Sequence, residues 1–204
     1  MENFELLLEQ LNEYIKNGEI SAMREMLTEM NVVDTALILE ELESKPRLHA
    51  FRILPKNVSA EVFAYLEPDT QADIVRMIND TELERLLDEM FLDDTVDFLE
   101  EVPANMVRRV LANTDKETRD IINRILKYPE NSAGSVMTIE MVDLHDTYTV
   151  GEAIKNIRRT GVDKETIYTC YVTDETKKLL GLVTAKDLML ADQNAQIEDI
   201  MNEN

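Results

Sequence analysis

Carboxylates are the side chains of this chain whose type and spacing are best suited to a chemical role. The 204 residues include 42 Asp and Glu against 21 Lys and Arg, which gives a net charge of -21. The densest acidic run is Asp80–Glu101, and a helix is expected over its last part, Leu92–Val102. That helix would align three acids along one face at positions i, i+4 and i+7, namely Asp93, Asp97 and Glu100.

Such an acidic face is suited to a divalent cation. Like charges at this spacing repel, at a cost of a few tenths of a kcal/mol for each pair. Mg²⁺ takes oxygen ligands, keeps several waters and binds through one or two carboxylates at a time. If this acidic face lay opposite a second acidic surface, the two would therefore form a weak Mg²⁺ site. The residues alone leave the alternative of a solvated acidic face that binds nothing.

The composition disfavours several other classes of protein. Contacts to nucleic-acid phosphates or to anionic lipid need a basic surface, so a chain this acidic is expected to attract cations or basic partners. Cys170 is the one cysteine, which excludes an internal disulfide and a cysteine-based metal site. His49 and His145 are isolated, and the sequence shows no nucleophile–base pair and no phosphate-binding glycine loop. We therefore expect no enzyme activity and no nucleic-acid partner.

No signal peptide is visible, and no apolar run approaches the ~20 residues that span a bilayer. Taken alone, the chain is expected to be soluble.

Residues 1–130 show the pattern of consecutive helices without a strand. Residues 3–17 carry apolar side chains at three- and four-residue spacing, which is typical of an amphipathic helix, and Gly18 ends it. Short helices with brief turns cannot each bury a face alone, so they are expected to stack in pairs, as in a solenoid. Helix openings or turns recur at intervals of 11 or 12 residues, near Pro46, Asn57, Pro68, Asp80, Leu92, Pro103 and Thr114.

Three helix starts carry the Thr-x-x-Glu pattern of a capping box, in which the two side chains satisfy backbone donors at the helix start. The pairs are Thr81 with Glu84, Thr114 with Glu117 and Thr149 with Glu152.

The stretch Lys127–Thr138 marks a change of pattern. Pro129 cannot continue a helix, and the Asn, Ser and Gly residues that follow it favour turns. This punctuation predicts a domain boundary, with a first domain at residues 1–130 and a second at residues 131–204.

The second domain is expected to be a compact α/β unit. The fold class is therefore multidomain α and α/β, with an all-α superhelical, solenoid-like domain first. The elements expected in the second domain are a strand at Met141–Leu144, a helix after Thr149, strands at Ile167–Val172 and Leu179–Thr184, and a helix at Ala185–Ala191.

Two stretches of this unit resemble a CBS motif, a regulatory module that normally works in pairs. They are Ser135-Val-Met-Thr138 and Gly181-Leu-Val-Thr-Ala-Lys-Asp-Leu188. Together with the Tyr128–Thr138 joint and the acidic helices before it, they resemble the MgtE family of magnesium transporters and channels. The similarity runs through the whole chain, including Leu54-Pro55 and the Asp93-Asp94 helix.

The resemblance implies a cytoplasmic region that senses Mg²⁺ and closes a membrane pore, as a homodimer, on the cytoplasmic side of the cell membrane. The transmembrane domain and the second CBS copy would belong to the full-length protein and lie outside this chain. The expected site therefore belongs to a sensor fragment.

The resemblance also implies ligand residues. On the helical side the Mg²⁺ ligands are expected to be Glu61, Asp93 and Asp97, with Asp94 as their neighbour. CBS pairs often bind ATP or another adenosine nucleotide. In them a Thr or Ser and an Asp bind the ribose, and a basic side chain lies near the phosphates. The matching residues here are Thr184, Asp187 and Lys186, although Asp187 is equally suited to cap its own helix.

One alternative function belongs to another class. The acidic helical repeat would be an interaction scaffold that holds a basic partner protein, joined to a nucleotide-sensing CBS module.

Overall fold

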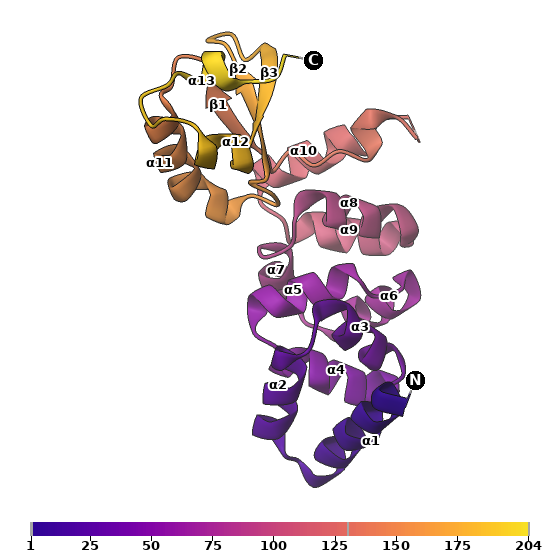
Figure 1. Ribbon diagram of the computed structural model, residues 1–204. Helices are drawn as coiled ribbons and strands as arrows, with labels where there is room; N and C mark the ends of the chain where they lie inside the picture. The colour runs from indigo at the N-terminus through magenta and orange to yellow at the C-terminus, as the bar shows by residue number, and fades with distance from the viewer. Residues whose placement is uncertain (1, 130, 204) are drawn as a thin grey trace. The chain divides into compact units, whose positions relative to one another are not determined.

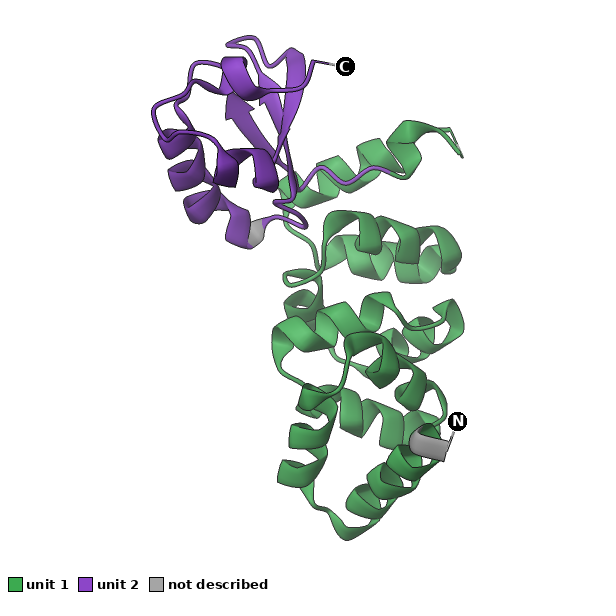
Figure 2. Cartoon of the chain, in the orientation of Figure 1, with its two compact units in different colours: residues 1–136 green, residues 137–204 purple. Residues whose placement is uncertain are grey.

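The computed structural model describes residues 2–129 and 131–203. Met1, Glu130 and Asn204, which the predicted domain bounds include, lie outside the described residues. The chain divides into two compact units, Met1–Val136 and Met137–Asn204 (Figure 2). Within the described residues, no helix combines the length and the apolar character that a membrane span requires.

Ten α-helices lie in the described residues of the first unit, and Figure 1 shows how they follow one another. In chain order they are α1 (Glu2–Asn17), α2 (Ile20–Glu29), α3 (Val32–Glu40), α4 (Ser44–Ile53), α5 (Lys56–Ala64), α6 (Pro68–Met77), α7 (Asp80–Leu87), α8 (Leu92–Glu101), α9 (Ala104–Ala112) and α10 (Lys116–Ile125).

The helices recur with a regular period. From α2 at Ile20 to α10 at Lys116, each helix begins twelve residues after the one before it. The mixed intervals of 11 and 12 residues predicted from the sequence were therefore wrong by one or two residues at several starts. The period also appears in the core, where an apolar residue two positions before a helix start is buried in six successive repeats: Leu42, Leu54, Leu66, Ile78, Met90 and Val102.

Alternate helices pack against each other, so the structural repeat is a helix pair of 24 residues. One series runs α2, α4, α6, α8 and α10, and the other runs α3, α5 and α7. At the centre Phe63 of α5 is 1% exposed. Its ring lies 6.2 Å from that of Phe51 and 5.3 Å, edge to face, from that of Phe98. These contacts join α5 to the preceding helix α4 and to α8, three helices further along the chain.

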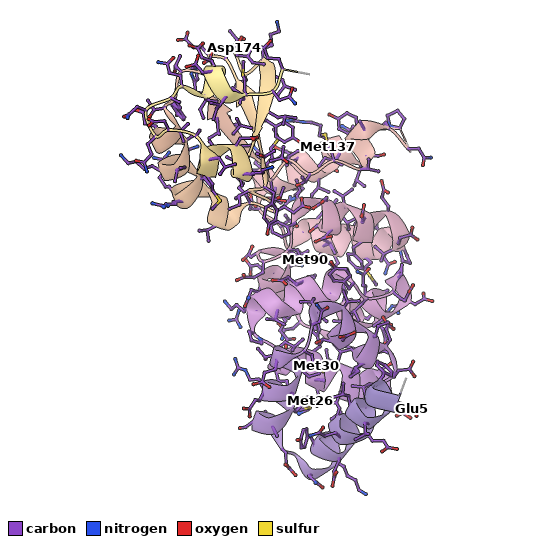
Figure 3. All side chains as sticks on the ribbon, in the orientation of Figure 1. Glu5, Met26, Met30, Met90, Met137 and Asp174 are labelled. Atoms are coloured by element: carbon purple, nitrogen blue, oxygen red, sulfur yellow. The ribbon has the colours of Figure 1, made fainter. Side chains whose placement is uncertain are left out.

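Methionines fill part of this packing (Figure 3). Met90 is 8% exposed, and Met26 and Met30 of the α2 region lie partly buried against the same core. A flexible thioether side chain is suited to the irregular gaps between stacked helices.

Side chains from the following helix satisfy carbonyls at several helix C-termini. In each case the donor is the fourth residue of its helix and the acceptor lies eight residues earlier, in the last turn of the preceding helix. The bonds are Thr35 Oγ1 to Leu27 O (3.2 Å), Arg47 Nε to Leu39 O (2.9 Å) and Gln71 Nε2 to Phe63 O (2.8 Å). These donors form hydrogen bonds with carbonyls in the last turn, which have no partner within their own helix.

The capping boxes predicted for the first unit were wrong. Before α7 the box is formed by Asn79 and Glu82, two residues earlier than Thr81 and Glu84. Before α10 the cap is Asp115, whose carboxylate accepts from the backbone N–H groups of Glu117 and Thr118. Asn and Asp cap helix starts at least as well as Thr, so the adjacent threonines are not needed for this role.

The joint between the predicted domains is ordered by turns. Asn131 has a positive φ of 60°, and Ser132 donates its N–H to Pro129 O at 3.1 Å. The short 3₁₀ helix η1 (Ala133–Ser135) follows. A Cβ at Gly134 would lie 2.6 Å from Cγ of Tyr128, so the ring covers a position that only glycine permits.

The second unit is built on a three-stranded sheet in the order β1-β2-β3. Strand β1 (Val142–His145) pairs in parallel with β2 (Thr169–Thr173), which pairs antiparallel with β3 (Leu179–Thr184). The helices are α11 (Val150–Thr160), α12 (Ala185–Leu190) and α13 (Ile197–Ile200), with the 3₁₀ helix η2 (Gly161–Asp163). This confirms the α and α/β fold class.

The core of this unit is separate from that of the first. Val142, Val172 and Val183 come from the three strands and are at most 1% exposed. Cys170 is fully buried among them, and burial raises the pKa of its thiol to about 11. Cys170 therefore occupies a buried position of β2.

The turn between β2 and β3 is fixed by Asp174 (Figure 3). Its Oδ1 accepts from the N–H and the hydroxyl of Thr176, both at 2.7 Å, and from the N–H of Lys178 at 3.0 Å. These bonds, the hydroxyl of Thr176 first, hold the pKa of Asp174 below its ordinary value. Lys177 takes a positive φ of 64° in the turn.

Candidate metal-binding face

In helix α8 the uncharged residues are buried and the acidic residues are not. Its predicted buried stripe is present, because Leu92, Val96 and Leu99 are 8%, 1% and 3% exposed. Thr95 and Phe98 are buried as well. Every residue of α8 that is not buried is an acid: Asp93 and Asp94 are half-buried, and Asp97, Glu100 and Glu101 are exposed.

The position of these acids along the helix has two electrostatic consequences. Asp93 and Asp94 lie in the first turn, where a negative charge is favourable because the backbone N–H groups point outward. Asp97 lies beyond the first turn, so it lacks this benefit. The last turn of α8 also contains no basic residue. Within the described part of the chain, no ion pair involves Asp97 or Glu100. The negative charges of Asp97 and Glu100 therefore have no positively charged partner among the described residues.

Glu61 lies on α5, a helix that packs against α8. It is exposed and is the sixth residue of its helix, the same position that Asp97 holds in α8. The described residues contain no group of three or more His, Cys, Asp or Glu side chains close enough to hold a metal ion together. The face thus offers carboxylates singly or in pairs, which is the manner in which Mg²⁺ is usually held.

The predicted nucleotide residues meet at the start of α12. Thr184 is the N-cap residue, and its N–H and hydroxyl both donate to Oδ2 of Asp187, at 3.0 and 2.5 Å. The hydroxyl of Thr184 accepts in return from the N–H of Asp187 at 3.2 Å. Lys186 is exposed between them. Asp187 therefore caps its own helix, and the bonds from Thr184 hold its pKa below the ordinary value of 3.8.

Sequence reasoning missed the ion pairs that join residues far apart in the chain. Arg52 and Glu82 form a two-bond ion pair although they lie thirty residues apart. No local pattern signals such a pair.

Comparison with known protein families identifies the family of this chain. The model of the MgtE intracellular N domain matches residues 30–131, half of the chain, and the CBS domain model matches residues 133–194. This chain belongs to the MgtE family. The two matches cover the helical repeat with α8 and the α/β unit with α12, so both candidate sites lie in regions that the family shares.

Curated relatives extend beyond this MgtE family chain. The magnesium transporter MgtE of Thermus thermophilus is 35% identical over 202 residues, which are 97% of this chain and 45% of that protein. The magnesium transporter MgtE of Bacillus subtilis is 25% identical over 187 residues, 92% of this chain and 42% of that protein. The chain therefore spans less than half the length of these relatives.

Solved structures in the family share the fold. The soluble part of a magnesium transporter matches with a TM-score of 0.89 at 27% identity, over 98% of this chain and 79% of that one. The cytosolic domain of the Mg²⁺ channel MgtE in complex with ATP matches with a TM-score of 0.88 at 34% identity, over 96% of this chain and 80% of that one.

Proposed function

We propose that this chain is the cytoplasmic, Mg²⁺-sensing regulatory region of an MgtE-type magnesium transporter or channel. The observation that carries the proposal is the face of α8, on which every residue that is not buried is a carboxylate. Family membership supports it, because relatives that include nearly all of this sequence are magnesium transporters.

The proposed mechanism is electrostatic. Asp93 and Asp97, with Asp94 beside them and Glu61 on α5, are the proposed ligands on the helical side. Without Mg²⁺ the repulsion among carboxylates favours an open arrangement of the chain. Bound Mg²⁺ removes that repulsion and favours a compact state, in which the pore of the full-length protein is closed. A ligand shifts such an equilibrium only through its different affinity for the two states.

The remaining parts of the proposal concern the whole protein. The curated relatives are more than twice as long as the matched region, which supports a transmembrane domain joined to this one in the same polypeptide. We place the region on the cytoplasmic side of the membrane and propose that it works as a homodimer. Its role is to sense an ion, and we propose no catalytic step.

Calorimetric titration with Mg²⁺ at constant ionic strength tests the ligand assignment. The double substitution Asp93→Asn and Asp97→Asn is expected to reduce the Mg²⁺ affinity by about tenfold, since each charged contact at an exposed site contributes about two- to fivefold. Glu9→Gln with Glu13→Gln is the matched control, because these acids of α1 are exposed and have the same i, i+4 spacing.

Equal losses in the two double variants would show that Mg²⁺ responds only to total charge. That result, together with equal responses to Mg²⁺ and Ca²⁺, would favour the scaffold alternative, in which the acidic repeat holds a basic partner.

We further propose that the α/β unit binds an adenosine nucleotide such as ATP at the start of α12. A relative with 34% identity has been solved with ATP, which supports this assignment. Both bonds from Thr184 reach Oδ2 of Asp187, so Oδ1 is the oxygen proposed to accept a ribose hydroxyl. Lys186 is exposed beside it and is proposed to meet a phosphate.

Displacement of a fluorescent adenosine nucleotide by ATP tests this second site. Lys186→Gln is expected to weaken ATP binding by about two- to fivefold. Lys178→Gln, in the turn before β3, is the control in the same unit. An equal effect of the two substitutions would contradict the assignment.

A further inference from the structure

A small cavity in the helical unit combines an apolar floor with a cationic rim. Its volume is about 220 Å³, and it lies among residues of α4, α5 and α7 and the end of α6. The floor is formed by side chains that are 5–7% exposed, namely Phe51, Leu54, Ile78 and Leu86. A floor of this kind is suited to the carbon skeleton of a small ligand.

One acid of the rim is already neutralised. Nε of Arg52 donates to Oε1 of Glu82 at 2.7 Å, and Nη2 donates to Oε2 at 2.9 Å. Oε2 also accepts the N–H of Asn79 at 2.9 Å. The guanidinium of Arg52 holds the pKa of Glu82 below its ordinary value of 4.5, so this carboxylate stays ionised and engaged.

Two further cations on the rim have no such partner. Lys56 and Arg85 both line the cavity and are exposed. Within the described part of the chain, neither of them takes part in an ion pair. Three cations and one carboxylate, whose pKa Arg85 also helps to lower, leave the rim with a net charge of +2 (three positive charges less one negative). They occur in a protein whose net charge is -21, where carboxylates to pair with them are abundant.

We propose that this cavity binds a small phosphate monoester, with its phosphate between Lys56 and Arg85 and its carbon skeleton on the apolar floor. A phosphate monoester carries a charge of about -1.5 to -2 at pH 7, which matches the net charge of the rim, whereas a single carboxylate would leave part of that charge uncompensated. The volume is below the ~300 Å³ at which pockets for drug-sized ligands begin, which favours a ligand smaller than a whole nucleotide. This site is therefore distinct from the one proposed at α12.

Amide chemical-shift titrations of the isotope-labelled chain test the proposal, with phenyl phosphate, inorganic phosphate and benzoate as probes at constant ionic strength. Phenyl phosphate is expected to shift the amides around Phe51, Lys56 and Arg85 and to bind more tightly than either of the other probes. Inorganic phosphate lacks the apolar part, and benzoate lacks the second negative charge.

Charge variants then separate the cavity from the general surface. Lys56→Gln with Arg85→Gln is expected to weaken phenyl phosphate binding by about tenfold, from two- to fivefold per exposed charge contact. Lys16→Gln with Arg24→Gln, two exposed cations of α1 and α2 away from the cavity, is expected to leave it unchanged. Equal losses in both pairs, equal binding of phenyl phosphate and benzoate, or no shifts at the cavity would each overturn the proposal.

Discussion

The two units of this chain satisfy their helix ends in different ways. In the α/β unit, α11 and α12 each begin with a capping box made by residues three positions apart, Thr149 with Glu152 and Thr184 with Asp187. In the helical unit, several helix ends depend on side chains from other helices. Glu40 at the end of α3, for example, accepts the N–H of Glu67 and the hydroxyl of Thr70 at the start of α6.

This difference follows from architecture. A solenoid has many helix ends, and it can satisfy them with side chains of neighbouring repeats as well as with local caps such as that of Asn79 and Glu82. Helix ends in the helical unit should therefore depend more on contacts with other helices than the starts of α11 and α12 do.

The largest effect is expected in the aromatic centre of the helical unit. Phe63→Ala removes the ring that touches Phe51 and Phe98 and is expected to reduce the free energy of unfolding of this unit by about 3–5 kcal/mol. Urea unfolding measures the loss. Hydrogen exchange of β2 amides is expected to change little, because the core of the α/β unit is a separate cluster. Leu6→Ala, at a position 65% exposed, is the control, and a loss below about 1 kcal/mol for Phe63→Ala would contradict the account.

The next effect concerns a cap supplied by a neighbouring helix. Arg47 donates to the carbonyls of Leu39, Glu40 and Leu42 at the end of α3. Arg47→Met keeps much of the side-chain volume but leaves these acceptors without their donor, at an expected cost of about 1–3 kcal/mol in unfolding free energy. Arg24→Met, on the exposed side of α2, is expected to cost less than about 0.5 kcal/mol. Equal costs would show that the cap supplied by Arg47 contributes nothing.

A smaller effect compares local caps in the two units. Thr149→Ala and Asn79→Ala each remove an N-cap acceptor and are each expected to cost about 1 kcal/mol. Thr81→Ala, at a residue that the sequence pattern wrongly made a cap, is expected to be nearly neutral. Thermal unfolding measures all three, and a cost for Thr81→Ala equal to that for Asn79→Ala would restore the sequence-based assignment.

Acid stability offers the smallest effect. The pKa of Glu82 is lowered mainly by Arg52, thirty residues away, and the pKa of Glu152 by Thr149, three residues away. A carboxylate with a depressed folded-state pKa stabilises the fold above its unfolded pKa, here about 4.5, and this stability is lost as the pH falls through the folded pKa. Glu82→Gln and Glu152→Gln should each flatten the fall in urea midpoint below pH 4.5.

Salt distinguishes these two carboxylates. A salt concentration of about 1 M shortens the screening length to about 3 Å, so it should weaken the contribution of the Arg52–Glu82 ion pair more than that of the Thr149–Glu152 hydrogen bonds. An equal salt response of the two variants would contradict the difference in cause.

The distinction between local patterns and contacts between distant residues explains how much of the molecule could be predicted from sequence. The helices within residues 2–125, the strand Leu179–Thr184 and the capping box at Thr149 follow from local periodicity and propensity, and the structure confirms them. The buried stripe of α8 follows from the spacing of Leu92, Val96 and Leu99, and it too is confirmed.

What could not be predicted depends on contacts between distant residues. The choice of Asn79 and Asp115 over nearby threonines as caps is set by where a helix can start within a twelve-residue repeat. The cavity rim formed by Arg52, Lys56 and Arg85 exists only after α4, α5 and α7 stack. The ligand roles of Glu61, Asp93, Asp94 and Asp97 stay predictions, as does the domain boundary after residue 130.

The central claim is that the acidic face of α8 makes this chain respond to Mg²⁺. Small-angle X-ray scattering during an Mg²⁺ titration at constant ionic strength, with Ca²⁺ and K⁺ as controls, tests it most directly. The account predicts a fall in the radius of gyration that is specific to Mg²⁺, absent in the Asp93→Asn, Asp97→Asn variant and retained in the Glu9→Gln, Glu13→Gln variant. An unchanged radius, or the same fall with Ca²⁺ and in both variants, would contradict it.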